Sequence, residues 1–338
     1  MLNILYQFNE EYAPYAVVSV CSLLENNKDV DTVHLYALLD NVQQSSRERL
    51  YKQVKKYGAG LTLIDAAPIV EKLKELGVND YRGSYATNLK LFLSDFISDT
   101  VDRILYIDCD TLIAGNLAET MRMDMGGMPV AMVLDSMCVS HKRALGFREN
   151  ENYFNAGIIL FDVKRWKEQK CTEQIVTYLQ TERSVYMAPD QDILNLVLRD
   201  SIAVLQPRYN MQPLHFVYNF KLYKKYWYQS NYYSEREIGE SMNDLKIIHF
   251  FRYLGQFPWH QNALHPHTDA FDCYLTRSEW SDYRKKPTQN NDLVFKAERW
   301  LYKVLPQKLF LPLFKMAHEM LLARADRASL KNLKSSRV

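Results

Sequence analysis

Cysteine is scarce in this sequence, and its placement excludes two kinds of small scaffold. The 338 residues contain 5 cysteines, an odd number, and no two of them form a C-x-x-C pair. A disulfide framework and a structural zinc site both need paired or clustered cysteines. We therefore expect neither, and the pattern is typical of a protein from a reducing compartment.

Long hydrophobic runs and a leader segment are also missing. No window approaches the roughly 20 apolar residues that a membrane-spanning helix needs. No basic segment followed by an apolar one opens the chain, so we predict no signal peptide. The composition, 47% hydrophobic and 24% charged, is that of a globular protein with a sizeable core. Its length suits one large α/β domain with an appendage, or two domains.

The glycine-rich turn of dinucleotide-binding domains is absent, because no G-x-G-x-x-G follows the first predicted strand. The chain nevertheless begins as such domains do. Strands are predicted at Leu2–Phe8, Thr32–Leu39 and Leu61–Ile64, with helices at Ala13–Leu24 and Ser45–Tyr57 between them. This alternation predicts βαβ units and a mainly parallel sheet. A nucleotide bound here would be held without the usual glycine-lined turn.

Two aspartates follow a predicted buried strand. The apolar run Ile104–Ile107 ends in Asp108-Cys109-Asp110. Ligand chemistry in open α/β sheets lies at the carboxyl ends of strands. Carboxylates that lose hydration there need compensation, which Mg²⁺ or Mn²⁺ supplies. The alternative is a solvated turn, in which aspartate is common. The stretch alone fits both interpretations.

Polar residues also accompany the next predicted elements. A helix is predicted over Ala86–Ile97, with Lys90 outside its apolar face. Strand Pro129–Leu134 is followed by Asp135, and strand Phe154–Phe161 opens on Asn155-Ala156-Gly157. The small residues of this last group permit close approach of a ligand to the backbone.

Three later features bear on the same chemistry. A helix beginning at Pro189 carries Asp190 and Asp192 in its first turn, where acidic residues are often only caps. The stretch 207–233 has little periodicity and is predicted to be a long functional loop. A last apolar strand, Leu245–Phe250, contains His249, which is either structural or a third metal ligand.

The order of motifs along the chain resembles that of glycosyltransferase family 8. It runs from the βαβ start through Asp-x-Asp, Asn-Ala-Gly and Asp-Gln-Asp to His-Phe followed by Pro-Trp. That family includes bacterial lipooligosaccharide galactosyltransferases and glycogenin. The resemblance is colinear from Leu2 to about Trp259. It implies an α/β fold of the GT-A nucleotide-diphospho-sugar transferase type, with a mainly parallel central sheet flanked by helices. It also implies metal-dependent, retaining transfer of a hexose from UDP-galactose or UDP-glucose to a saccharide acceptor of a cell-surface glycan or glycoconjugate.

Matching positions imply roles for individual residues. Asp108, Asp110 and His249 would bind Mn²⁺ or Mg²⁺, which holds the diphosphate. The nucleotide-binding set would be Tyr6, Asn9, Tyr12, Lys90, Asp108, Cys109, Asp110 and Arg252, with Asn9 and Tyr12 at the uracil and Tyr12 stacking on it. The donor sugar would be bound by Asp135, Asn155, Ala156, Asp190 and Gln191. The catalytic residues would be Gln191, on the reactive face of the anomeric carbon, with Asp190 and its acidic neighbour Asp192.

The chemistry supports this resemblance. UDP leaves poorly unless its growing negative charge is neutralised, which a divalent cation does as a Lewis acid. The sugar passes through an oxocarbenium-like state. Because the reactive-face residue Gln191 is an amide and not a carboxylate nucleophile, we favour front-face internal return, in which the leaving phosphate helps deprotonate the acceptor hydroxyl.

The chain departs from the family at three positions. Asn9 replaces an aspartate at the uracil, and Lys90 replaces an arginine, keeping the charge but losing the bidentate fork. Phe257-Pro258-Trp259 replaces Lys-Pro-Trp, so the phosphate-binding lysine is lost and Arg252 is its nearest substitute. A sugar-nucleotide-binding relative without turnover therefore stays an alternative.

A second alternative is a phosphatase. Asp108-Cys109-Asp110-Thr111-Leu112 also matches the motif of haloacid-dehalogenase-type Mg²⁺ phosphatases. In that class the motif belongs to the first strand of the catalytic core, whereas about a hundred residues precede it here. No later paired acidic motif of the expected kind follows.

We predict two parts, a transferase domain at 1–288 and a basic amphipathic helical tail at 289–338. Helix Leu293–Leu305 has an apolar face that includes Trp300, with Lys296, Arg299 and Lys303 outside it. A surplus of basic residues continues to Arg337, whereas the remaining chain is acidic. Such a helix is typical of binding to anionic membrane surfaces; the alternative is a helix packed on the domain. We expect a cytoplasmic protein, peripheral on the inner face of the cell membrane, with a glycan or lipid-linked acceptor and no nucleic-acid partner.

Overall fold

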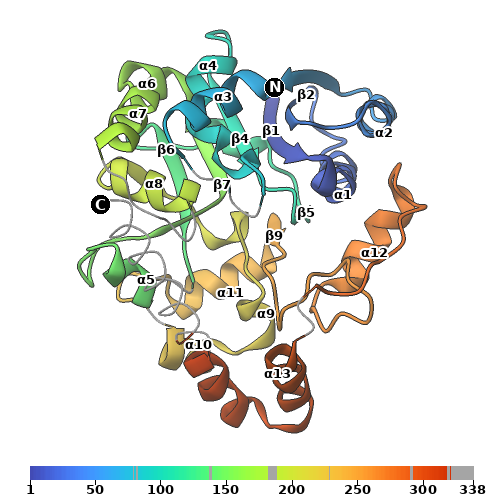
Figure 1. The fold of residues 1–338 in the computed structure, drawn as a ribbon, viewed down its shortest axis with the longest axis vertical. Coiled ribbons are helices and arrows are strands. Elements are labelled where there is room, and N and C mark those ends of the chain that lie inside the picture. Colours follow the sequence, from blue (N-terminus) through green and yellow to red (C-terminus); the bar gives the residue numbers. More distant parts are fainter. Residues whose placement is uncertain are drawn as a thin grey trace.

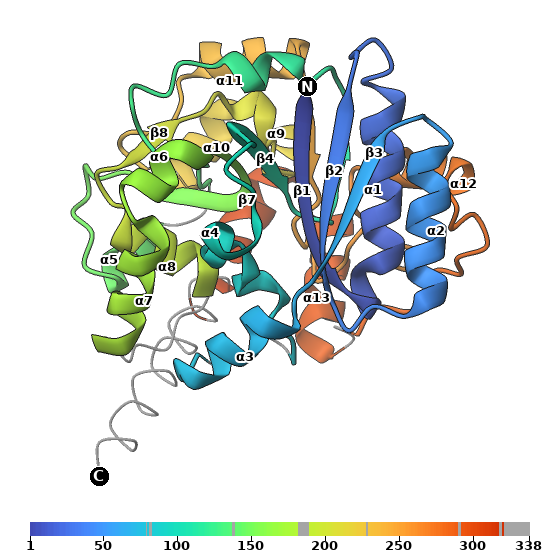
Figure 2. The ribbon, with the colours of Figure 1, turned by 90° about the horizontal axis from the view of Figure 1, so that it is seen from above.

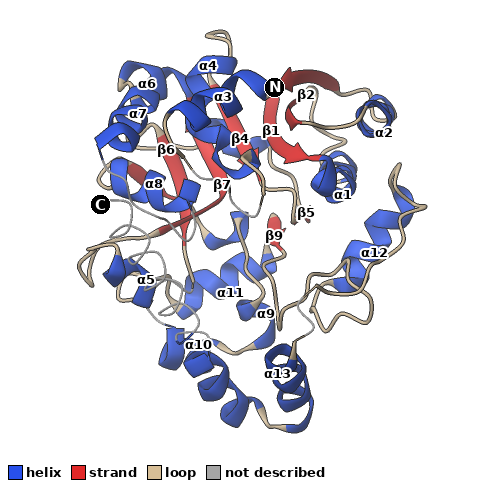
Figure 3. Cartoon of the chain, in the orientation of Figure 1, coloured by secondary structure: helices blue, strands red, loops and turns tan. Residues whose placement is uncertain are grey.

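The computed structural model describes residues 1–78, 80, 83–136, 139–181, 189–227, 229–289, 292–317 and 320. Its centre is a seven-stranded sheet flanked by helices (Figures 1 and 3). The strands are β1 (Leu2–Asn9), β2 (Val33–Asp40), β3 (Gly60–Asp65), β4 (Arg103–Ile107), β6 (Val130–Leu134), β7 (Phe154–Asp162) and β8 (Ile202–Val204). Their order across the sheet is β3-β2-β1-β4-β7-β6-β8.

The sheet is mainly parallel, as predicted, and β7 is its one antiparallel strand among the described residues. It pairs antiparallel with β4 on one side and β6 on the other, and the remaining neighbours are parallel. Strands β1, β4, β6 and β7 are buried almost throughout, as their continuous apolar runs require. The reversal of β7 has a consequence for function. Its first residues lie at the edge where β4 and β6 end.

The helices surround this sheet and cover much of its surface (Figure 2). They are α1 (Ala13–Glu25), α2 (Gln44–Lys55), α3 (Ala67–Glu75), α4 (Leu93–Phe96), α5 (Val139–Ala144), α6 (Val163–Glu168), α7 (Cys171–Thr181), α8 (Pro189–Val197), α9 (Leu214–Val217), α10 (Phe220–Trp227), α11 (Glu235–Asn243), α12 (Thr268–Arg277) and α13 (Leu293–Val304). Short 3-10 helices are η1 (Glu10–Tyr12), η2 (Ala86–Phe92), η3 (Ala118–Arg122) and η4 (Pro207–Tyr209).

A second, two-stranded sheet brings distant parts of the chain together. Strand β5 (Thr111–Ile113) pairs antiparallel with β9 (Ile247–His249), and Thr111 lies opposite His249. The backbone N–H of Phe250 also donates to Asp110 O at 2.7 Å. This pairing holds the end of β9 against the loop that leaves β4.

Two local predictions were wrong. The helix predicted over Ala86–Ile97 is a 3-10 helix followed by the short α4, and its residues Asn88–Phe92 are all buried. Lys90 is therefore inside the protein and not on an outer face. The stretch 207–233, predicted to be a loop, contains η4, α9 and α10. Packing of its aromatic residues stabilises these short helices, which carry too few turns to show a periodic pattern.

At the C-terminal end, α13 forms as predicted and a second helix covers 307–317. Both lie at the lower end of the view in Figure 1. Residues 318, 319 and 321–338, which hold the last basic residues of the predicted tail, lie outside the described residues. Within the part of the chain that is described, no helix has the length and apolar character to cross a membrane.

Candidate active site

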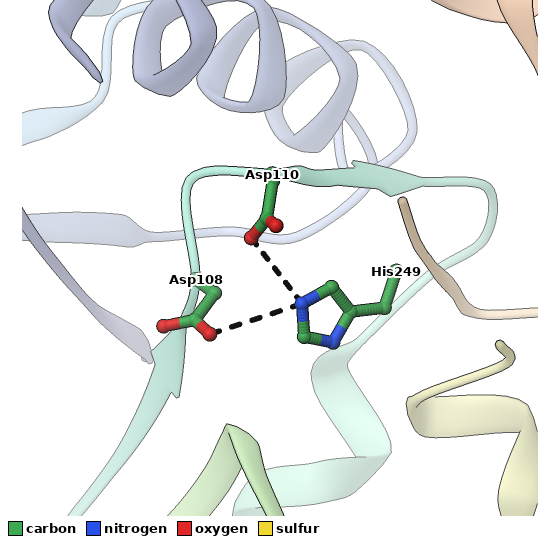
Figure 4. Close-up of side chains that lie close together, drawn as sticks. All are labelled: Asp108, Asp110 and His249. Carbon is green, nitrogen blue, oxygen red and sulfur yellow. Dashed lines mark ion pairs between the residues drawn. The ribbon is translucent and has the colours of Figure 1, made fainter. Parts of the chain in front are cut away.

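Three predicted metal ligands converge where β4 ends (Figure 4). The His249 Nε2 atom lies 3.2 Å from Asp110 Oδ1 and 3.8 Å from Asp108 Oδ2, and one ligand atom from each residue falls within 4.8 Å of the others. The Asp108 and Asp110 side chains keep 27% and 19% of their surface exposed, whereas His249 keeps 5%. Two carboxylate oxygens and an imidazole nitrogen, partly open to solvent, suit Mn²⁺ or Mg²⁺.

The electrostatics of the two aspartates differ. Burial raises the pKa of Asp108, which the neighbouring Asp110 carboxylate reinforces and the Lys90 ammonium opposes. Burial also acts to raise the pKa of Asp110, but the charge and hydrogen bond of His249 lower it by more. The two negative carboxylates repel each other, and each attracts a cation. A divalent ion bound between them would remove this repulsion.

Lys90 is the cation already present beside these carboxylates. Its Nζ lies 2.7 Å from Asp190 Oδ2 and 3.6 Å from Asp108 Oδ1, and it donates to Ala156 O at 3.0 Å. Only 1% of the side chain is exposed. Burial acts to lower the pKa of Lys90, yet the two carboxylates raise it by more, so the group stays charged. Lys90 therefore joins the end of β4 to the start of α8.

Four of the five predicted sugar-binding residues form one hydrogen-bonded group, and the fifth, Asp190, pairs with Lys90. The Asn155 Nδ2 donates to Gln191 Oε1 at 2.9 Å and to Asp135 Oδ2 at 3.2 Å, and the Ala156 N–H donates to Gln191 Oε1 at 3.0 Å. Gln191 Nε2 donates in turn to Asp135 Oδ2 at 3.4 Å. The antiparallel direction of β7 makes this possible, because Asn155 pairs with Val133 of β6 while Gly157 O accepts from Asp108 N.

Asp192 lies apart from that group. It is completely buried, and its carboxylate accepts hydrogen bonds from Tyr153 OH and from His141 Nε2, the latter at 2.8 Å. Tyr153 OH also accepts from Gln191 Nε2 at 3.2 Å. The structure thus puts Asp192 behind Gln191, connected to it through Tyr153.

The predicted nucleotide-binding residues are dispersed. Asn9 caps η1 by accepting from the Tyr12 N–H at 3.2 Å, and Tyr12 is partly buried. Arg252 is exposed. Tyr6 and Cys109, in contrast, are 1% and 5% exposed, and they bond Ser19 Oγ and Gln7 O respectively. The structure does not bring these two side chains to the accessible side of the metal ligands.

Phe257, which stands where the resemblance leads one to expect lysine, belongs to an aromatic stack. Its ring lies parallel to Trp259 at 4.5 Å, and Trp259 stacks on Tyr15 at 4.0 Å. Tyr15 meets Tyr12 edge to face at 5.6 Å. Phe257 thus replaces the charge of a lysine with aromatic packing. The packed rings extend through Trp259 and Tyr15 to Tyr12, the residue predicted to stack on the uracil.

Sequence reasoning missed several residues that support the site. Tyr106 OH donates to Asp108, and Asn210, Tyr153 and His141 bond the residues described above. Tyr106 lies two residues before Asp108 on β4, so the period of a strand puts both on one side. We find no sequence signal for Asn210, which lies in the stretch that was predicted to be a loop.

Known proteins resemble this chain in sequence and in fold. The family model "Glycosyl transferase family 8" matches residues 3–263. General stress protein A of Bacillus subtilis is 24% identical over 284 residues, covering 83% of this chain and 95% of that protein. A lipopolysaccharide 1,2-glucosyltransferase of Escherichia coli K12 is 27% identical over 285 residues, covering 83% and 79%. The crystal structure of galactosyltransferase LgtC with donor and acceptor sugar analogues aligns with a TM-score of 0.66 at 20% identity, covering 82% and 96%.

Proposed function

This chain belongs to glycosyltransferase family 8 and is a transferase, and from that premise we propose that it is a metal-dependent, retaining hexosyltransferase. The donor is a UDP-hexose, either UDP-glucose or UDP-galactose, and the acceptor is a saccharide of a cell-surface glycan or glycoconjugate. Both sugars stay open because one similar protein is called a glucosyltransferase and a protein of similar fold a galactosyltransferase.

The observation that carries this proposal is the junction of two sites through Lys90. Asp108, Asp110 and His249 stand on one side of it, and Asp190 with the Asn155–Gln191 amides on the other. A UDP-sugar has two matching parts in the same order: a diphosphate, which binds cations, and a hexose, which forms hydrogen bonds. Asn9 and Tyr12 are proposed to hold the uracil, and Arg252 to approach the diphosphate.

A bound Mn²⁺ or Mg²⁺, held by Asp108, Asp110 and His249, would supply a Lewis acid that neutralises charge on the leaving diphosphate. The protein's own groups do the rest. Lys90 orients Asp108 and Asp190 through its ion pairs, and its buried charge contributes to the positive field around the phosphates. Asn155, Ala156 and Asp135 fix the Gln191 amide beside the sugar.

Retention of configuration is proposed to occur by front-face internal return. Double displacement needs a carboxylate free to bond the anomeric carbon. Asp190 is engaged with Lys90, and Asp192 is buried against Tyr153 and His141. Gln191 then stabilises the oxocarbenium ion without bonding to it. Detection of a covalent glycosyl-enzyme on Asp190 or Asp192 by mass spectrometry would refute this route.

The test of function is UDP release with Mn²⁺ from UDP-glucose, UDP-galactose and their N-acetyl forms. We expect release from one hexose donor, dependence on Mn²⁺, and none from the Asp110→Asn variant. Tight UDP binding with no release from any donor would instead support a relative that binds sugar nucleotides without turnover. The phenylalanine at position 257, where the family has a phosphate-binding lysine, is the reason to test for it. Hydrolysis of p-nitrophenyl phosphate with Mg²⁺ would favour the phosphatase alternative.

We also propose that α13 binds an anionic membrane and that the protein works at the cytoplasmic face of the cell membrane. One face of α13 contacts the domain, because Arg299 Nη1 donates to Leu254 O at 3.2 Å and Tyr302 meets Tyr253 at 5.7 Å. The other face, here called the outer stripe, consists of Leu293, Ala297, Trp300 and Val304. Three of its members are 82%, 62% and 50% exposed, and Lys296 and Lys303 flank it.

Vesicle binding tests the outer stripe. Trp300→Ser with Val304→Ser is expected to weaken binding to phosphatidylglycerol vesicles about tenfold or more, because most of the apolar area is lost. Leu63→Ser, which changes a 42% exposed leucine on β3, is the matched control and should bind as wild type does. Equal binding by all three proteins would exclude the proposal.

A further inference from the structure

Asn210 is a buried amide that lies between the metal ligands and the amides of the sugar site. It is 1% exposed and follows η4. Its Oδ1 lies 3.0 Å from His249 Nδ1, and its Nδ2 donates to Asn155 Oδ1 at 2.7 Å. It thus hydrogen-bonds a predicted metal ligand and an amide of the sugar site at the same time.

The direction of these hydrogen bonds follows from a backbone group. The Gly157 N–H can only donate, and it donates to Asn155 Oδ1 at 3.0 Å. The atom of Asn210 that faces this oxygen must therefore be the NH₂ group, which leaves Asn210 Oδ1 toward the imidazole. An oxygen acceptor there requires a proton on His249 Nδ1. The Nε2 atom, which faces Asp108 and Asp110, is then the nitrogen that can bind a metal ion once it gives up its hydrogen bond to Asp110.

The same logic continues to Gln191. Since Asn155 Oδ1 is fixed as the acceptor, its Nδ2 points at Gln191 Oε1, which also accepts from the Ala156 N–H. Two backbone N–H groups at the start of β7 thus set the polarity of a path that runs from His249 through Asn210 and Asn155 to Gln191. A metal-ligating histidine needs its second nitrogen held in this way.

We propose that Asn210 is a positioning residue that holds a proton on His249 Nδ1 and orients the ring relative to the Asn155 and Gln191 amides. Its action on His249 concerns the apoprotein and Mn²⁺ binding alone. Its action on Gln191 rests on the proposed transferase function. Two substitutions separate these halves, because each removes a different hydrogen bond.

Asn210→Ala removes both hydrogen bonds. In long-range ¹H–¹⁵N spectra of histidine-labelled apoprotein we expect the wild-type His249 signal, identified by its absence in His249→Asn, to show a proton on Nδ1. The alanine variant should shift toward the Nε2–H tautomer, because Asp110 is then the hydrogen-bond partner that the ring keeps. Mn²⁺ affinity, measured by electron paramagnetic resonance, should fall about 10- to 100-fold, the range typical of lost partners of metal-bound histidines.

Asn210→Asp keeps an acceptor for His249 but cannot donate to Asn155. It should retain the Nδ1–H tautomer and a near wild-type Mn²⁺ affinity while lowering UDP-sugar turnover. This isosteric variant also serves if the alanine variant does not fold. Asn27→Ala is the matched control, since Asn27 is 2% exposed and makes two hydrogen bonds at the end of α1, far along the chain from β9.

Two results would overturn the proposal. One is an Asn210→Ala protein with the wild-type tautomer and Mn²⁺ affinity. The other is an equal loss of Mn²⁺ affinity in Asn210→Ala and Asn27→Ala at equal loss of thermal stability. The tautomer and Mn²⁺ measurements need no turnover, so they decide the role of Asn210 even if the wild-type protein transfers no sugar.

Discussion

Two Asp-x-Asp triplets in this protein have the same spacing and opposite geometry. Asp108 and Asp110 leave the end of β4 and turn their carboxylates toward one imidazole, that of His249. Asp190 and Asp192 stand in the first turn of α8, and their carboxylates diverge. The first pairs with Lys90, and the second lies buried against Tyr153 and His141.

The backbone causes the difference. Asp108, Cys109 and Asp110 form the bend between β4 and β5, where both carboxylates lie beside His249, whereas residues two apart in an α-helix stand about 200° apart. The residues in the middle of the two triplets also differ in direction. Cys109 points into the core, and Gln191 is turned toward Asn155 and Asp135. One triplet therefore offers two carboxylates to a ligand, whereas the other offers one amide, Gln191, between two carboxylates that pair elsewhere.

Removing a carboxylate from the β4 triplet should give the largest effect. Asp110→Asn is expected to abolish Mn²⁺ binding and to lower UDP release by about 10³-fold, since several kcal/mol of charge stabilisation are lost. Thermal stability should hardly change, because the side chain is partly exposed. Asp95→Asn, a partly exposed surface aspartate, is the control and should leave both measurements unchanged. A variant that keeps Mn²⁺ affinity would remove Asp110 from the metal site.

Lys90 connects the triplets, so its loss should appear as instability. Lys90→Met leaves the buried Asp190 carboxylate without a cation, and we expect a loss of about 3–5 kcal/mol in urea unfolding. Adding Asp190→Asn should recover part of it, because an amide needs no counter-charge. Lys72→Met breaks an exposed pair with Asp95 and should cost less than about 1 kcal/mol. Similar costs for both lysines would show that burial does not strengthen the Lys90 pairs.

Gly157 tests how closely the β4 triplet depends on the position of His249. A Cβ atom at Gly157 would overlap the His249 ring at Cε1 and Nδ1, so Gly157→Ala must displace the imidazole. We expect Mn²⁺ affinity to fall about 10- to 100-fold, as when the support of a metal ligand is lost. Gly239→Ala is the control, because nothing lies within 4 Å of its Cβ in helix α11. Unchanged Mn²⁺ affinity in Gly157→Ala would mean that the ring can move freely.

Substitution of Glu298 in α13 should give the smallest effect on stability. This residue is a third kind of carboxylate, because burial raises its pKa and it holds its proton at pH values where an exposed glutamate is ionised. Burial raises the pKa of Glu298 to about 7, against the opposing charge of Arg299. The unfolded chain loses this proton near pH 4.3. The folded protein thus binds one more proton between these values, and its stability falls as pH rises from about 4.3 to about 7.

Glu298→Gln should remove this contribution to the pH dependence. Above pH 7 the variant is expected to melt about 1–2 °C higher than wild type, and below pH 4 the two should coincide. Melting curves across this range measure it, and Glu240→Gln, on the exposed end of α11, is the control. If the two curves are separated by the same amount at every pH, the carboxyl is not protonated in the folded state.

Strands and site residues could be predicted from the sequence where the local hydrophobic pattern and the chemistry of the side chains agree. Continuous apolar runs are enough to predict β1, β4, β6 and β7, and charged residues at strand ends are enough to propose Asp108 and Asp110 as ligands. His249 could be paired with them only through the order of motifs along the chain. The burial of Lys90 and the helices within 207–233 could not be predicted, because long-range packing and not periodicity decides them.

The sequence alone thus determined which residue types are available and which elements they adjoin: two acidic triplets, a lysine, an Asn-Ala-Gly and a late histidine. Tertiary structure decided which of them meet. The antiparallel course of β7 brings Asn155 to the end of β4, and the β5–β9 pairing brings His249 to Asp110. Both contacts join residues far apart in the chain, so no local pattern encodes them. Asp108 and Asp110 face one imidazole because the bend after β4 and the β5–β9 pairing bring both carboxylates to His249, whereas the first turn of α8 directs Asp190 and Asp192 apart.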